Sequence, residues 1–281
     1  MENLIHKLLS IPPNYIIIFM VASFYILEHL LNAPFKFNKR PFHLFHNVLF
    51  QIPSYVVGFL FAIFQVWSIQ WISDHHIGLF NQIEIPFVAK LIIGVACFDF
   101  NNYWFHRLAH KLPVVWRIHR VHHSDTTMDS STFFRFHPLE ILFFGPAQIL
   151  AAMVFGLDTL TLGLYFLIQT VFFILQHTNI LFPSWTDSVF GKIFTTPNLH
   201  KVHHSQNQEY TDSNFADIFI LWDKFFGTYK YLPVKKIEYG LQEFDEEKKQ
   251  TFWYLIISPF FKIKRITNVV KKKDSQFIAQ N

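Results

Sequence analysis

Histidine is the residue type in this chain whose number and spacing could support chemistry. Eight of the 16 histidines form three short sets, which read His106-Arg-Leu-Ala-His110, His119-Arg-Val-His122-His123 and His200-Lys-Val-His203-His204. Residues three or four positions apart share one face of a helix, so the imidazoles of each set can meet at a metal ion. We expect the three histidines of each HxxHH set to converge on one point in this way.

Two further histidines are candidate ligands. His137 precedes one apolar segment and His177 ends another, so both are expected to face the same surface as the three sets. Ten imidazoles exceed the roughly four to six ligands that saturate one first-row metal ion, which predicts two ions. The single cysteine, Cys97, excludes a cysteine-based metal site. An imidazole-rich site with open positions suits iron that binds O2, although ligand type alone leaves zinc, copper and manganese open.

The composition indicates what surrounds these histidines. Apolar residues make up 51% of the 281 residues and charged residues only 16%, with a mean hydropathy of +0.23. Soluble domains usually carry about 25% charged residues, so we expect a membrane protein. The chain has 9 glycines and no glycine-rich turn of the kind that binds dinucleotides, and no motif points to nucleic acid.

Five apolar segments are candidates to cross a bilayer core about 30 Å thick, which takes roughly 20 residues of helix. They are Tyr15–Leu31, Val48–Ile72, Pro86–Phe105, Leu139–Phe155 and Thr159–Gln176. Only Gly156–Asp158 separates the last two, which predicts a tight helical hairpin. The expected fold class is all-α integral membrane, with four to five transmembrane helices and a cytosolic, histidine-rich helical cap.

Charged residues in the connections predict which side of the membrane the histidine sets face. The loop after the first span holds Lys36, Lys39 and Arg40, whereas the loop Ser73–Ile85 after the second holds no Lys or Arg. Cytoplasmic loops collect Lys and Arg, so the N-terminus is expected outside and all three sets inside. The basic tail Lys262–Lys273 falls on the same side, where positive charge suits an anionic leaflet.

The motifs, taken in order, resemble those of one known family. They run through Asp99, Tyr103, His106-xxx-His110, Trp116-xx-His119-xx-His122-His123-Ser124, Arg135-x-His137-Pro138-x-Glu140, His177-Thr-Asn179, His200-xx-His203-His204 and Asn214, and they end in Trp222-Asp223 and Phe226-Gly227-Thr228-Tyr229. Over about residues 90 to 230, this pattern is similar to the fatty acid hydroxylase/sterol desaturase superfamily.

The resemblance implies an integral-membrane non-haem di-iron oxygenase. In such a protein, two iron ions (Fe2+/Fe3+) use O2 and two electrons to hydroxylate or desaturate a lipid. The implied metal ligands are the eight histidines of the three sets, with His177 and His137 as additional ligands. The implied units are an N-terminal transmembrane hairpin (1–85), a fatty acid hydroxylase-like catalytic region with three further spans (86–230) and a basic C-terminal segment (231–281).

Further expectations concern the surroundings of the site. Asp99 is expected to orient a ligand by accepting the outer N–H of an imidazole. The lipid substrate would enter from the bilayer, and electrons would come from an external donor of the cytochrome b5 or ferredoxin type, because the chain has no haem, iron–sulfur or nucleotide motif. The compact size favours a bacterial inner membrane over the endoplasmic reticulum. The alternative is a histidine-rich metal transporter, whose ligands would be distributed through the membrane rather than gathered at one side.

Overall fold

The computed structural model describes residues 12–31 and 40–266, so Lys36, Lys39 and the tail beyond residue 266 lie outside the described residues. Helices joined by short 3-10 turns and loops make up this part of the chain, and it contains no strand. The longer helices are α2 (Pro13–Leu30), α3 (Arg40–Leu49), α4 (Gln51–Asp74), α5 (Phe87–Lys111), α6 (Pro113–His123), α7 (Ile141–Phe155) and α8 (Thr159–His177). The shorter ones are α9 (Ser184–Val189), α10 (Pro197–His203), α11 (Gln208–Thr211), α12 (Leu221–Phe225) and α13 (Phe252–Ile257). The predicted all-α fold is confirmed.

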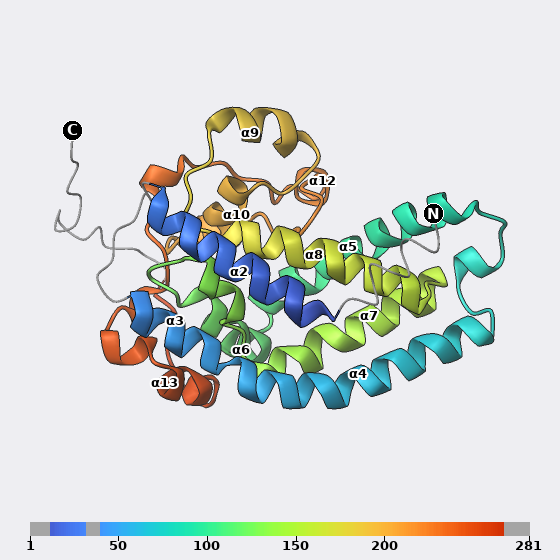
Figure 1. The fold of residues 1–281 in the computed structure, drawn as a ribbon, viewed down its shortest axis with the longest axis horizontal. Helices are drawn as coiled ribbons and strands as arrows, with labels where there is room; N and C mark the ends of the chain where they lie inside the picture. The colour runs from blue at the N-terminus through green and yellow to red at the C-terminus, as the bar shows by residue number, and fades with distance from the viewer. Residues whose placement is uncertain (1–11, 32–39, 267–281) are drawn as a thin grey trace.

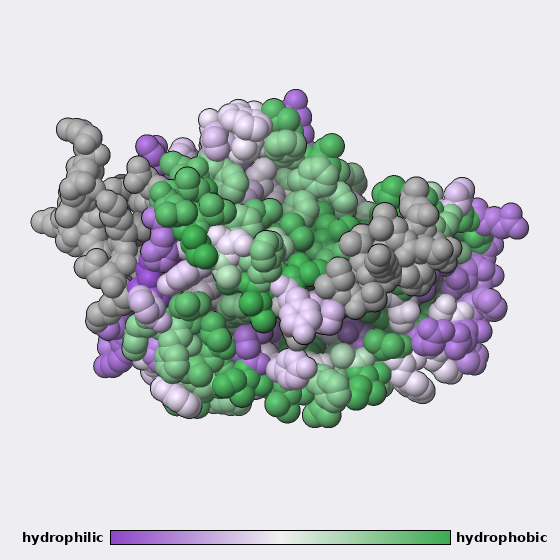
Figure 2. All heavy atoms as spheres, in the orientation of Figure 1, coloured by the Kyte–Doolittle hydropathy of each residue, from purple (hydrophilic) through white to green (hydrophobic). Residues whose placement is uncertain are grey.

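Among the described residues, three stretches are long and apolar enough to cross a membrane: Arg40–Asn81, Pro138–Phe155 and Thr159–His177. They correspond to the second, fourth and fifth predicted spans. The apolar helix Tyr15–Leu30 is shorter, and α5 falls outside this group because polar residues such as Asp99 interrupt its second half. Figure 2 shows hydrophobic residues over the middle of the face in view and hydrophilic residues gathered at its right-hand end. The chain therefore has the helices of a membrane protein, and spanning by α2 and α5 stays a prediction.

Helices α4, α5, α7 and α8 form the body of the bundle (Figure 1). Helix α4 packs along α7, and α5 contacts both α7 and α8. Their shared core contains the buried side chains of Ile69, Phe98, Ala151, Leu162 and Tyr165. Helix α2 packs against α8 and the 3-10 turn Ser130–Phe134. The unit boundaries expected near residues 85 and 230 stay predictions.

Two glycine turns meet at one end of the bundle. Gly78 (φ 99°) and Gly156 (φ 74°) both have positive φ, and a Cβ on Gly78 would lie 2.2 Å from the backbone N of Gly156. Only glycine fits such an approach. Asp158 then caps α8 by accepting the N–H of Thr161 at 2.8 Å. The chain reverses at Gly156–Asp158 as predicted, and α8 returns along the bundle (Figure 1).

The opposite end holds α3, α6, α10 and α13 (Figure 1) and, with them, all three histidine sets. Buried charges fix this end. Glu28 on α2 accepts N–H groups from Ser130 at 3.0 Å and Asn179 at 2.9 Å, and it pairs with Arg40 on α3. The fully buried guanidinium of Arg135 donates to the carbonyl of Val121 on α6 and to other polar groups around it. These contacts hold the helices that carry the histidines in one place.

Candidate metal centre

The two helices that carry the HxxHH sets both begin at a proline, and a threonine caps one of them. Helix α5 ends before Leu112, whose backbone is extended, because a residue that precedes proline disfavours the helical conformation. Pro113 then begins α6, since its fixed φ suits the first turn of a helix. Helix α10 starts in the same way at Pro197, and the Thr196 side chain caps it by accepting the N–H of Leu199 at 3.3 Å. The histidines therefore lie on short helices with defined starts.

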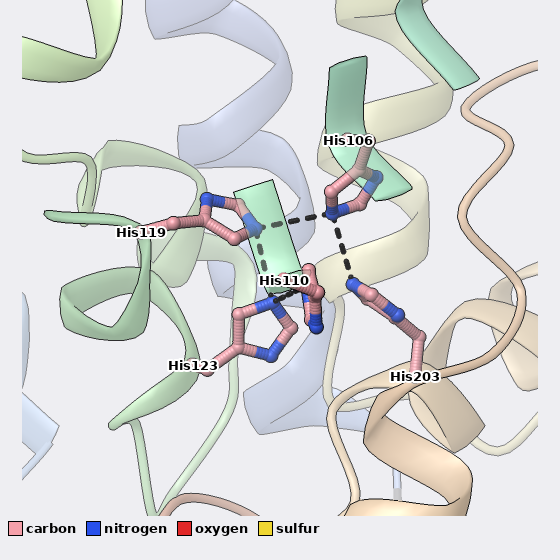
Figure 3. Close-up of side chains that lie close together, drawn as sticks. All are labelled: His106, His110, His119, His123 and His203. Carbon is pink, nitrogen blue, oxygen red and sulfur yellow. Dashed lines mark hydrogen bonds between the residues drawn. The ribbon is translucent and has the colours of Figure 1, made fainter. Parts of the chain in front are cut away.

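Five histidines from α5, α6 and α10 form the first group (Figure 3), which we name the five-histidine cluster: His106, His110, His119, His123 and His203. Their ligand atoms all lie within 4.8 Å of one another. The Nε2 atom of His106 is 3.1 Å from that of His119 and 3.1 Å from that of His203. Nitrogens that bind one metal at about 2.0–2.1 Å lie roughly 3 Å apart, so this cluster has the dimensions of a metal site.

The other group, which we name the four-histidine cluster, contains His122, His177, His200 and His204. The Nε2 atom of His177, at the end of α8, is 3.1 Å from that of His122 and 3.2 Å from that of His204. The imidazoles of His200 and His204 approach each other to 3.1 Å through the same atoms. The two clusters are adjacent, because His122 and His123 are consecutive residues and each belongs to a different one.

Each HxxHH set divides between the two clusters, so the expectation that its three histidines converge is wrong. His119 and His123 belong to the five-histidine cluster, whereas His122 belongs to the four-histidine cluster. In the second set the division is reversed, since His200 and His204 share one cluster and His203 joins the other. Consecutive residues point about 100° apart around a helix, so a helix between two centres directs i+3 to one and i+4 to the other. Two groups of ligands match the predicted pair of metal ions.

Most of the ring nitrogens that face away from the clusters are hydrogen-bonded. His119 Nδ1 lies 2.8 Å from a carboxylate oxygen of Glu140, and His110 Nδ1 lies 3.1 Å from Asp212. Backbone carbonyls accept from three more: Phe215 from His106 at 2.7 Å, Ser213 from His203 at 2.6 Å and Phe173 from His177 at 2.6 Å. The Nδ1 atoms of His122, His123 and His200 have no hydrogen-bond partner among the described residues. A proton held at Nδ1 leaves the Nε2 lone pair free for a metal, which is how bound histidines are usually oriented.

One loop, residues 212–215, supplies three of these five partners. Asn214 holds the loop in shape with a positive φ of 50°, a conformation that asparagine adopts more readily than most residues. Its side chain donates to the carbonyls of Leu199 and Lys230, at 2.9 and 2.8 Å. The strained backbone therefore lies where it orients metal ligands.

Burial keeps the histidines of the two HxxHH sets neutral. It lowers the pKa of all six, to about 3 for His119. For the other five, neighbouring imidazoles lower the pKa further. Metals bind the neutral imidazole, so protons compete weakly for this site.

Two predicted site residues lie outside the clusters. His137 Nδ1 accepts the N–H of Leu139 at 3.2 Å, and its Nε2 donates to the carbonyl of Ile256 at 3.0 Å. Both ring nitrogens are used, which does not match the ligand role predicted for His137. Asp99 also differs from its predicted role, because its carboxylate accepts the N–H groups of Ile218 and Phe219 and the indole of Trp222 rather than an imidazole. Glu140 and Asp212 take the position expected of Asp99.

Sequence reasoning also missed a buried pair behind the clusters. His43 on α3 contacts both carboxylate oxygens of Asp125 at 2.9 Å, and Thr132 donates to the same carboxylate at 2.7 Å. Asp125 follows the first HxxHH set after one residue, Ser124, so this pair ties α3 to the end of α6. The only available signal was an aspartate beside the motif, and nothing in the sequence identified its partner.

A cavity of about 360 Å³ opens beside both clusters. His106 and His119 line it from the five-histidine cluster, and His122 and His200 line it from the other. Much of the remaining wall is aromatic: Phe61, Phe133, Phe136, Phe144, Phe166 and Phe173. Phe61 also borders an apolar groove outside the cavity with Val57, Leu60, Phe64 and Leu142, between α4 and α7. Phe61 therefore lies between this groove and the cavity that the clusters border.

Comparison with known proteins defines the class. Residues 91–228 match the family model described as fatty acid hydroxylase, and this region contains all nine clustered histidines. The chain belongs to the fatty acid hydroxylase/sterol desaturase superfamily. No solved structure matches the chain.

Several curated relatives match part of the chain. The chain is 32% identical over 154 residues to an alkylglycerol monooxygenase of Homo sapiens. This match covers 51% of the chain and 31% of the relative. A very-long-chain aldehyde decarbonylase of Oryza sativa subsp. indica is 32% identical over 167 residues, covering 57% of the chain and 62% of the relative. An ornithine lipid hydroxylase of Rhizobium tropici is 29% identical over 149 residues, covering 53% and 44%. The match thus spans about a third to three fifths of the length of these relatives.

Proposed function

We propose that the protein is a membrane-bound non-haem di-iron oxygenase that hydroxylates a lipid with O2 and electrons from an external donor. The observation that carries this proposal is the cavity, which exposes histidines of both clusters to one apolar space. Iron bound there would supply the oxidising power for O2 activation and C–H bond cleavage. The names of the relatives, a monooxygenase and a hydroxylase of lipids among them, favour hydroxylation over desaturation.

The protein's own residues position the ligands and exclude water. Glu140 and Asp212 would fix the rings of His119 and His110 through their outer nitrogens. Phe136 stacks on His122 with ring centroids 4.1 Å apart, and Phe144 lies beside His119 at 6.0 Å. These aromatic rings would hold a lipid chain against the clusters in a dry space.

We infer that the electron donor docks at the end of the bundle that holds the clusters. Trp116 lies 4.9 Å from His110 between ring centroids, and the guanidinium of Arg265 lies over the Trp116 ring, 4.2 Å from its centroid. Arg265 and the nearby Lys262 and Lys264 give this surface positive charge, which suits an acidic partner such as a cytochrome b5 or a ferredoxin. The proposed location is an inner bacterial membrane with this end in the cytoplasm.

The metal transporter is the weaker alternative. Each cluster offers four or five imidazoles within 4.8 Å, which suits a resident ion rather than one in transit. The cavity beyond the clusters is lined mainly by phenylalanine and amide side chains, which are poor ligands for a transition metal.

The direct test is turnover of lipids by purified protein. Iron-loaded protein in detergent, supplied with O2, a chemical reductant and an extract of neutral and polar lipids, should give a lipid whose mass has increased by one oxygen. His200→Ala, which removes a cavity-lining ligand, should give none. Absence of oxygenated lipid from protein that holds its metal, across the whole extract, would overturn the proposal.

A further inference from the structure

The cavity contains polar side chains for which lipid oxidation gives no role. They are Gln65 on α4, Asn102 on α5, Gln148 on α7, Gln169 on α8 and Asp217 on the loop before α12. A cavity that held only a hydrocarbon chain would have no need of five amide and carboxyl groups, because buried polar groups must find hydrogen-bond partners.

These side chains lie further into the bundle than the clusters. Asn102 precedes His106 by one helical turn, which is about 6 Å along α5. Gln169 precedes His177 by about 12 Å along α8, and Gln148 follows Glu140 by a similar distance along α7. The cavity therefore has imidazoles at one end and a polar group at the other.

Asp217 organises the polar end. One carboxyl oxygen accepts from the amides of Asn102 at 2.5 Å and Gln169 at 2.6 Å. The Gln176 side chain holds the backbone carbonyl of Asp217 at 2.7 Å, which fixes this part of the loop against α8. The arrangement is therefore built into the fold rather than formed by mobile side chains.

The buried hydroxyl of Tyr165, near Gln148 and Asp217, has no hydrogen-bond partner among the described residues but does not line the cavity. Three polar atoms that do line this end have no hydrogen-bond partner within the described chain: Oδ1 of Asp217, Oε1 of Gln148 and Nε2 of Gln65. The three side chains are only 1%, 3% and 7% exposed. Buried polar atoms without partners are rare in proteins, and a ligand in the cavity can supply the missing bonds. Together they offer an acceptor, a donor and a carboxyl oxygen, which complements a hydroxyl group.

The charge of the cavity restricts the ligand further. Its described lining residues include no lysine or arginine, so a phosphate or carboxylate would have no cation to pair with. Burial raises the pKa of Asp217 well above its ordinary range, and nearby Asp99 raises it further, which favours the uncharged form of this carboxyl. Both facts favour a neutral ligand.

We propose that Gln65, Gln148 and Asp217 form a subsite for the hydroxyl group of a neutral lipid, and that this subsite sets which carbon faces the clusters. The proposal rests on the oxygenase function and names its substrate class. The hydroxyl donates to Oε1 of Gln148 and accepts from Nε2 of Gln65, and Oδ1 of Asp217 makes a third hydrogen bond with it. The carbons next to this group lie toward the histidines, and the remaining chain passes Phe61 into the bilayer.

Equilibrium binding of radiolabelled 1-hexadecanol to the full metal-loaded chain in detergent tests the subsite without turnover. Unlabelled 1-hexadecanol should compete at least tenfold better than hexadecanoic acid or hexadecane. Gln148→Leu and Gln65→Leu should each lower the affinity for 1-hexadecanol five- to twentyfold and leave the affinity for hexadecane unchanged. Gln65→Leu removes an amide nitrogen without a protein partner, and Gln148→Leu removes, besides its unpartnered oxygen, only one long bond of 3.4 Å to Asn102 Oδ1, so both variants are expected to fold. Gln70→Leu, the same change on an exposed residue of α4, is the matched control and should bind as the unmodified chain does.

The outcomes separate this inference from the proposed function. Equal competition by hexadecane and 1-hexadecanol, or an equal loss in Gln70→Leu and Gln148→Leu, overturns the subsite even if lipids are hydroxylated. Selective binding that Gln148→Leu removes supports the subsite. If such protein then oxidises no lipid while holding its metal, the oxygenase proposal fails and the hydroxyl-binding site stands.

Discussion

His122 and His123 are neighbours in sequence, yet their loss should have different consequences for metal binding. Both side chains are buried, at 2% and 1% exposure, so each replacement by alanine removes a similar amount of packing. His122→Ala leaves three histidines in the four-histidine cluster, whereas His123→Ala leaves four in the other. Four ligands complete a tetrahedral site, so the cluster left with three histidines should hold its ion more weakly than the cluster left with four.

The unmodified chain should therefore carry about two ions, His123→Ala close to two and His122→Ala close to one. Elemental analysis after gel filtration against a mild chelator measures these numbers, and thermal unfolding confirms that both variants are folded. Equal losses in the two variants, or a greater loss in His123→Ala, would refute the division of the set between two centres.

Four other predictions follow from the same geometry. His177→Ala should lower metal content and abolish turnover, whereas His137→Ala should keep both ions; loss of an ion in His137→Ala would restore it as a ligand. In metal-free protein, burial holds the pKa of His119 at about 3 against 6.5 when exposed, so between these values the unfolded chain binds the proton and the folded chain does not. The free energy of unfolding should then fall by up to about 1.4 kcal/mol per pH unit for this group as pH drops, and melting temperatures of chelated protein that are equal at pH 7 and pH 5 would contradict this. A Cβ on Gly145 would lie 2.1 Å from the Phe61 ring, so Gly145→Ala should slow lipid turnover several-fold with metal content unchanged. Reporters fused after Ser124 and Ser205 should both read cytoplasmic and one at Gln82 external, and opposite readings for the first two would separate the histidine sets.

The sequence predicts which residues belong to the site better than it predicts which of them contact one another. Spacing identified eight of the nine clustered histidines, and the ninth, His177, was a candidate because it ends an apolar segment. The short segment Gly156–Asp158 located the turn between α7 and α8. The distribution of histidines between the two clusters could not be predicted from the sequence, because it depends on where α6 and α10 lie relative to each other. Helical periodicity gives directions around one axis and says nothing about a second centre.

Polar residues were harder to assign than ligands. Asp99 lies on the same face of α5 as His106, which suggested contact with an imidazole, but the backbone of residues 218–219 reaches its carboxylate instead. Asp212 carries no motif signal and lies about a hundred residues from His110, the ring that it holds. His137 lies next to Pro138 at the start of a 3-10 turn, where the ring caps the backbone. Each outcome depends on a contact between distant segments.

The three histidine motifs all span five residues, but they differ in the number of histidines, and this number corresponds to how many clusters each helix borders. Helix α5 borders one cluster and carries two histidines four residues apart, which is the minimum for gripping a single ion from one turn. Helices α6 and α10 border both clusters, and the motif on each has one histidine more, which lies three residues after the first histidine. A residue inserted inside such a motif would rotate one end of it by about 100° relative to the other, so its histidines would no longer reach both clusters. The additional histidine thus indicates, in the sequence alone, a helix that lies between the two clusters.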